Sequence, residues 1–293
     1  MTMFSPLVPP KKFAITTHPA QPEVGVEARE IAAKMEAMGA DPVAVFTIYD
    51  PELNRALKSG SVDVLIALGG DGTMLRAGHL VAPYGVPVLG INRGRFGFLM
   101  EINQVECLDR LQQLMRGEYW LEQRMMLKSR LLRDGNDLGE WQVLNEVVVC
   151  RGQYVRPIQL TASLDDYVLA SYNADGLIAA TPTGSTAYAL AVGGPIMPPE
   201  LRAILIVPVA SHLSMDRSII LPENSKVVIK VNTNHQAVLS ADGQPPYLLE
   251  DGDLVEVTAS ENSVAFIRFQ DPGYFYRNLN KYMEQNPITG GIK

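Results

Sequence analysis

The first third of the chain alternates short apolar runs with segments whose apolar residues recur every three or four positions. The apolar runs are typical of strands buried on both faces of a parallel sheet. They are Phe13–Thr17, Val43–Ile48, Val62–Leu68 and Val86–Ile91. The segments between and after them are predicted to be helices, around Val24–Met38, Leu53–Lys58, Met74–Val81 and Val105–Met115. This alternation predicts a parallel sheet with helices packed against it.

The pattern changes at about Leu121, where short runs with a period of two begin. Alternation of this kind is typical of strands with one buried face, as in the segment Ile158–Leu164. Asp-Gly pairs at 134–135, 242–243 and 251–252 are turn signals. Further strands are predicted at Lys226–Val231, Asp253–Val257 and Val264–Phe269. The second half is therefore predicted to be β-rich.

These patterns predict an α/β protein with three parts. We expect an N-terminal parallel-sheet domain over residues 1–120 and a C-terminal β-rich domain over residues 121–270. A helical tail over residues 271–293 is expected to pack back on the N-terminal domain. The length of 293 residues allows two domains at roughly 150 residues each.

Composition and charge exclude several classes of protein. Hydrophobic residues make up 47% of the chain and charged residues 19%, which excludes a disordered or collagen-like protein. The net charge of −7 gives no chain-wide attraction to nucleic acid or to an anionic membrane. A polyphosphate would have to be bound locally, by backbone N–H groups, a metal ion and a few cations.

Cysteine usage and hydropathy indicate where the protein resides. Cys107 and Cys150 are far apart in the sequence and give no disulfide framework, as expected in a reducing compartment. We find neither a signal peptide nor an apolar run of the roughly 20 residues that span a membrane. The expected location is cytoplasmic.

The strongest local motif is the sequence GGDGT at residues 69–73, between a predicted buried strand and a predicted helix. Glycines allow close approach of a ligand to the backbone, and a helix N-terminus attracts anions, so the loop suits phosphate. The carboxylate of Asp71 repels phosphate, which suggests that it deprotonates a hydroxyl or organises a metal ion. The alternative is a tight turn in which Asp71 caps the helix.

A second polar loop, TPTGSTAY at residues 181–188, follows Asp175-Gly176 and a short strand, and GGP follows at 193–195. Its hydroxyl groups can hydrogen-bond the ribose and phosphates of a nucleotide. An ordinary turn rich in serine and threonine is the alternative.

A third motif is the pair Asn145-Glu146, which interrupts an apolar strand predicted over Val143–Val149. Buried polar groups need partners, which either a ligand or a structural network could supply.

Taken together, these segments resemble the NAD kinase family. The resemblance covers about residues 62–275, and its most specific motif is the stretch DGLIAATPTGSTAY at 175–188. The other matching motifs are GGDGT at 69–73, GINRGRFGFL at 90–99, the NE pair at 145–146, GGP at 193–195 and DGQ at 242–244.

The resemblance implies a Rossmann-like N-terminal domain, a β-rich NAD-binding C-terminal domain and transfer of the γ-phosphoryl group of ATP to the 2′-hydroxyl of the adenosine ribose of NAD. It makes Asp71 the proton acceptor, with Gly72 beside it. It places dinucleotide contacts at Asn145, Glu146, Asp175, Thr186, Ala187, Tyr188 and Gln244, and further ligand contacts at Arg76 and Arg156.

The resemblance also implies Mg²⁺ with ATP, or with polyphosphate as the phosphoryl donor, and no metal site made of protein residues alone. It implies a homodimer or homotetramer in which Asp175 reaches the site of the neighbouring subunit. Neither nucleic acid nor a membrane is an expected partner.

Three features depart from the family pattern or leave it open. Ala191 stands where many members have a hydroxyl residue, which puts one ligand hydrogen bond of this binding position in doubt. No proline precedes His212, which we expect to alter a loop and not the chemistry. Asn173 occupies a position used in the choice between NAD and NADH, and its neutral side chain leaves that choice open.

Two other functions remain open from the residues alone. One is a lipid or sugar kinase that shares the GGDG loop, against which the TPTGSTAY stretch argues. The other is a non-catalytic dinucleotide sensor, against which the retained Asp71 argues.

Overall fold

The computed structural model describes residues 7–94, 97–103, 105–154, 156–165, 167–211 and 216–285. The chain forms two compact units. The first contains the chain up to Gln123 and from Asn262 on, and the second contains Arg124–Glu261. Two long strands, β5 (Trp120–Arg133) and β16 (Leu254–Arg268), belong partly to each unit.

The first unit is a parallel sheet covered by helices, as the sequence predicts. Its strand order is β2-β1-β3-β4, and each adjacent pair is parallel. The strands are β1 (Phe13–Thr17), β2 (Ala44–Thr47), β3 (Val64–Gly69) and β4 (Val88–Asn92). The helices are α1 (Pro22–Ala37), α2 (Pro51–Lys58), α3 (Asp71–Val81), the 3-10 helix η1 (Ala82–Tyr84), α4 (Cys107–Met115) and α6 (Tyr274–Gln285).

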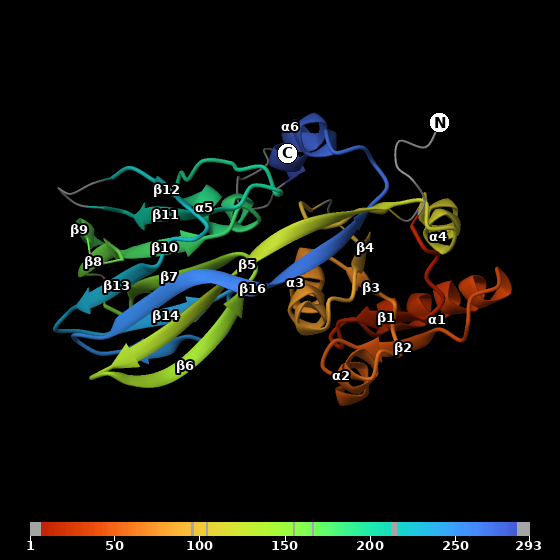
Figure 1. Cartoon of the computed structure of the whole chain (residues 1–293), viewed down its shortest axis with the longest axis horizontal. Coiled ribbons are helices and arrows are strands. Elements are labelled where there is room, and N and C mark those ends of the chain that lie inside the picture. The colour runs from red at the N-terminus through yellow and green to blue at the C-terminus, as the bar shows by residue number, and fades with distance from the viewer. Residues whose placement is uncertain are drawn as a thin grey trace. The chain divides into compact units, whose positions relative to one another are not determined.

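Figure 1 shows the helices of the first unit around its parallel sheet. Alternate residues of the strands face different helices. Ile66 and Leu68 of β3 share one buried cluster with residues of α1 and α4. On the opposite face, a Cβ at Gly90 of β4 would lie 3.2 Å from the sulfur of Met74 in α3. Right-handed crossovers from β1 to β2 and from β3 to β4 run in opposite directions along the sheet, which places α1 and α3 on opposite faces.

The second unit is β-rich, as predicted, and its strands form two sheets. One sheet has the order β12-β11-β10-β7-β14-β15, and the other contains β13, β8 and β9 beside β16, with β5 and β6 next to it. The elements are β6 (Asn136–Val143), β7 (Glu146–Arg151), β8 (Ile158–Leu164), β9 (Tyr167–Ala174), β10 (Gly176–Ala180), the 3-10 helix η2 (Gly184–Thr186), α5 (Tyr188–Ala191), β11 (Ala203–Val209), β12 (Ile219–Pro222), β13 (Val227–Asn232), β14 (Ala237–Ala241) and β15 (Tyr247–Leu249).

One hydrophobic core fills the space between these two sheets. It contains Val147 and Leu177 from one sheet and Ile158, Leu160 and Ile229 from the other. The outer face of the first sheet carries a smaller buried cluster, to which α5 contributes Ala189. The polar loop 181–188 is thereby anchored on the outside of the six-stranded sheet.

Tight turns follow these strands at positions where Asp-Gly pairs predict them. Asp134 and Gly135 join β5 to β6 with φ of 49° and 79°, and Asp242 and Gly243 follow β14 with φ of 48° and 67°. Left-handed backbone of this kind is tolerated best by Gly, Asn and Asp. No helix in the described part of the chain is long and apolar enough to cross a membrane.

Candidate functional site

Asp71 lies where the parallel sheet meets α3. β3 ends at Gly69, Gly70 is the N-cap residue, and Asp71 begins the helix. The Asp71 carboxylate makes two hydrogen bonds to a distant loop: Oδ2 accepts the N–H of Phe98 at 2.9 Å and Oδ1 accepts the N–H of Leu99 at 3.2 Å. Because Gly70 and not Asp71 is the N-cap residue, the alternative in which Asp71 is the N-cap of α3 is wrong.

Two glycines permit this arrangement. A Cβ at Gly97 would lie 2.1 Å from Oδ1 of Asp71, and one at Gly69 would lie 2.5 Å from Oγ1 of Thr73. Neither position has room for a side chain, since real Cβ atoms do not approach other atoms this closely. A side chain at position 97 would therefore displace the Asp71 carboxylate or the loop that holds it.

The other predicted residues of the first unit lie beside Asp71 on α3. Gly72 and Arg76 are both exposed. The Nη1 of Arg76 donates to the carbonyl of Gly72 at 3.1 Å, so the guanidinium folds back along the first turn of the helix. A cation is thus held near a helix N-terminus, where anions are favoured.

In the second unit, a second aspartate holds the main chain around Asn145. The Asp242 carboxylate accepts the N–H groups of Leu144, Asn145 and Glu146 at 2.7, 2.8 and 2.9 Å. The prediction of one continuous strand over Val143–Val149 is wrong, because β6 ends at Val143 and β7 begins at Glu146. The Asp-Gly pair at 242–243 predicts a turn, but no local signal predicts this role of Asp242, because its partners lie about a hundred residues away.

Glu146 is buried, and its environment favours the neutral acid. Burial and, to a lesser extent, the nearby Asp242 raise the pKa of Glu146 to about 8, although the backbone N–H of Tyr188 acts in the opposite direction. Glu146 Oε2 is buried without a hydrogen-bond partner among the described residues. This carboxyl group therefore has an atom that a ligand could engage.

The threonine and serine hydroxyl groups of the 181–188 loop form hydrogen bonds within the loop and to neighbouring segments of the protein. Thr181 Oγ1 donates to the carbonyl of Leu144 at 2.5 Å and accepts the N–H of Gly184, while Ser185 Oγ donates to Pro182 O at 2.6 Å and accepts the N–H of Met197. The loop also approaches the turn at 144–146 closely, since a Cβ at Gly184 would lie 2.1 Å from the carbonyl oxygen of Asn145. These hydroxyls build the loop, as the alternative of a serine- and threonine-rich turn expects.

The remaining predicted residues of the second unit are spread over several elements. Asp175, half-buried before β10, pairs with Nε of Arg151 through Oδ1 at 3.0 Å. Thr186 is buried and donates to the carbonyl of Thr183 at 3.0 Å. Ala187 is half-buried, whereas the exposed positions are Arg156, Asn173, Tyr188, Ala191 and Gln244. Tyr188 is joined to Glu146 through its backbone N–H.

No group of three or more His, Cys, Asp or Glu side chains that could hold a metal ion occurs among the described residues. His212, whose loop is expected to depart from the family pattern, lies outside them. Mg²⁺ is often held by one or two carboxylates together with the phosphates of its substrate. A single carboxylate such as Asp71 fits that manner of binding.

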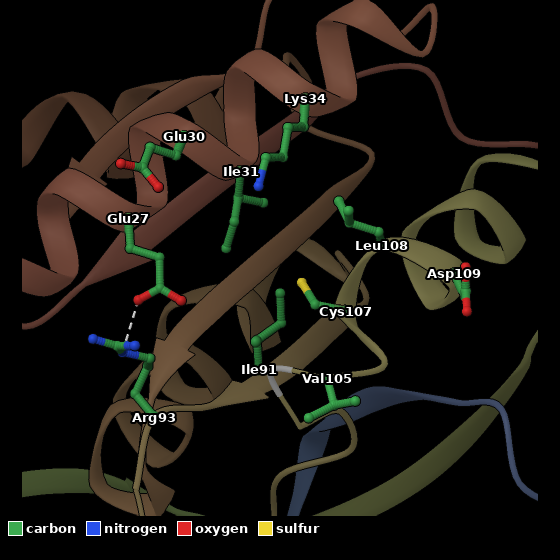
Figure 2. A pocket seen from close by; sticks show the side chains of 10 residues that line it. All are labelled: Glu27, Glu30, Ile31, Lys34, Ile91, Arg93, Val105, Cys107, Leu108 and Asp109. Atoms are coloured by element: carbon green, nitrogen blue, oxygen red, sulfur yellow. Dashed lines mark ion pairs between the residues drawn. The ribbon is translucent and has the colours of Figure 1, made fainter.

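A separate cavity of about 520 Å³ lies in the first unit, between α1, the segment after β4 and α4. Figure 2 shows that both apolar and charged side chains line it. Among them, Nε of Arg93 pairs with Oε2 of Glu27 at 2.7 Å. Burial raises the pKa of the lining Cys107 thiol to about 11, so this sulfur is protonated at neutral pH. None of the predicted site residues lines this cavity.

Comparison with known proteins gives one consistent result. A family model described as the ATP-NAD kinase N-terminal domain matches residues 16–119, and one described as the ATP-NAD kinase C-terminal domain matches residues 144–269. An NAD kinase of Symbiobacterium thermophilum is 40% identical over 278 residues, which cover 92% of this chain and 98% of the relative. An NAD kinase of Heliobacterium modesticaldum is 41% identical over 236 residues, which cover 80% of this chain and 82% of the relative.

Solved structures show the same fold. A yeast NADH kinase complexed with NADH has a TM-score of 0.82 at 26% identity, covering 95% of this chain and 89% of the yeast chain. An NAD kinase from Archaeoglobus fulgidus in complex with ATP has a TM-score of 0.69 at 23% identity, covering 92% of this chain and 98% of the Archaeoglobus chain.

The raised pKa of Glu146 predicts a pH dependence of stability. Because the folded-state pKa of about 8 exceeds the ordinary 4.5, the folded state holds a proton that the unfolded state releases as the pH rises between these values. The wild-type protein should therefore lose about 2–4 kcal/mol of unfolding free energy relative to Glu146→Gln between pH 5 and 8. Urea unfolding of both proteins at the two pH values measures this. Glu261→Gln, which changes an exposed carboxyl group, is the control, and an equal pH dependence of Glu146→Gln and wild type would contradict the prediction.

Proposed function

This chain belongs to the NAD kinase family of enzymes, and from that premise we propose that it transfers the γ-phosphoryl group of ATP to the 2′-hydroxyl of the adenosine ribose of NAD. The observation that carries the proposal is a carboxylate, Asp71, fixed by two backbone N–H groups beside the start of α3. The NADH bound in the yeast relative supports a nicotinamide dinucleotide as the acceptor.

Asp71 is proposed as the general base. As the 2′-oxygen forms its bond to the γ-phosphorus, the bond from that phosphorus to the bridging oxygen of ATP breaks and its electron pair leaves with ADP. The proton of the 2′-hydroxyl passes to the Asp71 carboxylate. Mg²⁺, when bound with ATP, supplies charge neutralisation at the phosphates, and Asp71 is the carboxylate of the first unit that would help to hold it.

The second unit is proposed to bind the dinucleotide. Glu146 is the main candidate, because its Oε2 is buried without a partner among the described residues and its raised pKa makes it a possible O–H donor at neutral pH. The other contacts expected from the family motifs are Asn145, Asp175, Thr186, Ala187, Tyr188 and Gln244, with Gly72, Arg76 and Arg156 as further ligand contacts.

The active form is proposed to be a homodimer or homotetramer in which Asp175 serves the site of a neighbouring subunit. The strands β9, β12 and β15 end the strand orders of their sheets and carry exposed apolar side chains. These include Tyr167, Val168, Ile220 and Leu248. Exposed apolar edge strands are commonly covered by another chain.

Replacement of Asp71 by asparagine should lower kcat for NADP formation by about 10²–10⁴-fold. The amide can accept only one of the two backbone N–H groups, so the melting temperature should fall, while the circular dichroism spectrum should show a retained fold. The amide keeps the shape of the side chain but cannot accept the proton. Asp109→Asn, which removes an exposed carboxylate on α4 of the same unit, is the control and should keep full activity. A folded Asp71→Asn enzyme with activity within tenfold of the wild type would exclude the general-base role.

Shared sites predict complementation between two inactive variants. Asp71→Asn and Asp175→Ala subunits should each have little activity alone, and mixed oligomers should regain part of it, because some of them contain one intact site. NADP formation is measured after subunit exchange, which is followed by mass spectrometry. Exchange without any recovery of activity would count against a shared site, and a fully active monomer in light scattering would exclude one.

A further inference from the structure

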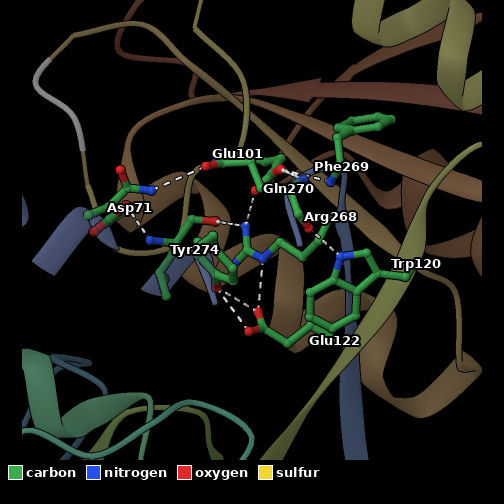
Figure 3. Close-up of polar contacts among 10 residues, drawn as sticks. Asp71, Glu101, Trp120, Glu122, Arg268, Phe269, Gln270 and Tyr274 are labelled. Atoms are coloured by element: carbon green, nitrogen blue, oxygen red, sulfur yellow. Dashed lines mark hydrogen bonds and ion pairs between the residues drawn. The ribbon is translucent and has the colours of Figure 1, made fainter. Parts of the chain in front are cut away.

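A fully buried arginine lies at the end of β16 in the first unit, a few residues before α6 begins. Arg268 donates from Nε to Glu122 Oε2 at 2.9 Å and from Nη1 to Glu101 Oε2 at 3.1 Å. Its side chain is 0% exposed, and those of the two carboxylates are 1% and 2% exposed. Figure 3 shows this group of side chains. Removing one partner of such a buried group is costly, because it leaves an uncompensated charge.

Both carboxylates are themselves held by further contacts. Glu101 Oε1 accepts the N–H of Phe269 at 2.8 Å, and Glu122 Oε1 accepts the hydroxyl of Tyr274 at 2.9 Å. The network therefore joins three segments that are far apart in the sequence: the loop after β4, the start of β5 and the start of α6. The orientation of the Arg268 guanidinium is fixed from all of them.

The same guanidinium contacts the loop that holds Asp71. Nη1 of Arg268 donates to the carbonyl of Leu99 at 3.3 Å, and the N–H of Leu99 donates to Asp71 Oδ1 at 3.2 Å. The neighbouring Phe98, whose N–H holds Asp71 Oδ2, packs its ring against Tyr282 of α6 with 4.6 Å between centroids. The main chain of Leu99 thus links the buried cation to the Asp71 carboxylate.

We propose that Arg268 is a positioning residue for phosphoryl transfer, which fixes the loop 98–99 and through it the Asp71 carboxylate, with Tyr274 of α6 holding the network in place. The proposal rests on the proposed role of Asp71 as the base. Stability alone does not require such a network, since well-packed apolar residues often replace a buried ion pair without loss. Reaction geometry does require it, because a displacement of about 1 Å can lower a rate by about 10²-fold.

The principal variant is Arg268→Lys, which keeps the charge but loses the planar fork that reaches Glu122, Glu101 and Leu99 together. We expect kcat to fall by about 10–100-fold, with KM for NAD and for ATP within about threefold of the wild type. The matched control is Arg277→Lys, which makes the same change in an exposed ion pair with Asp271 and should leave both constants unchanged.

A double-mutant cycle separates positioning from a merely structural role. In the Asp71→Asn background, Arg268→Lys should change the residual rate by less than about twofold, because its effect passes through the missing carboxylate. A fall by the same factor in both backgrounds, or a wild-type kcat for Arg268→Lys alone, would overturn the proposal.

A second variant decides the question if Arg268→Lys does not fold. Tyr274→Phe removes only the hydroxyl group that donates a hydrogen bond to Glu122. It should lower kcat by about threefold or more in the wild-type background, and it should not lower kcat in the Asp71→Asn background. An unchanged kcat in folded Tyr274→Phe would then overturn the proposal. A fully active Asp71→Asn enzyme would overturn the base role and this proposal together, whereas an inactive Asp71→Asn with unaffected Arg268 and Tyr274 variants would overturn the positioning role alone.

Discussion

The pair of hydrogen bonds from Phe98 and Leu99 to the Asp71 carboxylate is the constraint on which the first unit depends. β3 brings Asp71 to the carboxyl edge of the parallel sheet, which is where ligands bind in open α/β folds. A carboxylate that is to accept a proton from one particular hydroxyl must be held in place before the substrate arrives. The backbone of the 97–99 loop does this without using a side chain that could compete for the ligand.

The second unit uses the same physical device for a different purpose. Asp242, in the turn after β14, accepts three consecutive backbone N–H groups and so fixes the turn that carries Asn145 and Glu146. This places a second carboxylate near Glu146 and helps to raise its pKa. In both units, an aspartate orders the main chain of a segment that is distant in the sequence. The functional side chains therefore depend on long-range polar contacts more than on their own secondary structure.

The sequence predicts the local features well. The apolar run before Gly69 predicts β3 and the glycines predict a sharp turn into α3, because these signals lie within a few residues of one another. The strand–turn–strand arrangement around Asp134 is local for the same reason. The long-range partners could not be predicted, since Phe98 lies 27 residues from Asp71 and Leu99 lies 169 residues from Arg268. The buried hydroxyls of the 181–188 loop show a related limit, because a polar residue type does not reveal which way its side chain points.

The central claim is that the loop main chain holds Asp71 in its reactive position, and a pair of glycine variants tests it most directly. Gly97→Ala would place a Cβ within 2.1 Å of Asp71 Oδ1, whereas Gly94→Ala, in the same loop, meets nothing within 4 Å. The decisive measurement is kcat for NADP formation in both folded variants. The account predicts a fall of at least about 10²-fold for Gly97→Ala and near wild-type turnover for Gly94→Ala. Wild-type turnover by Gly97→Ala would contradict it.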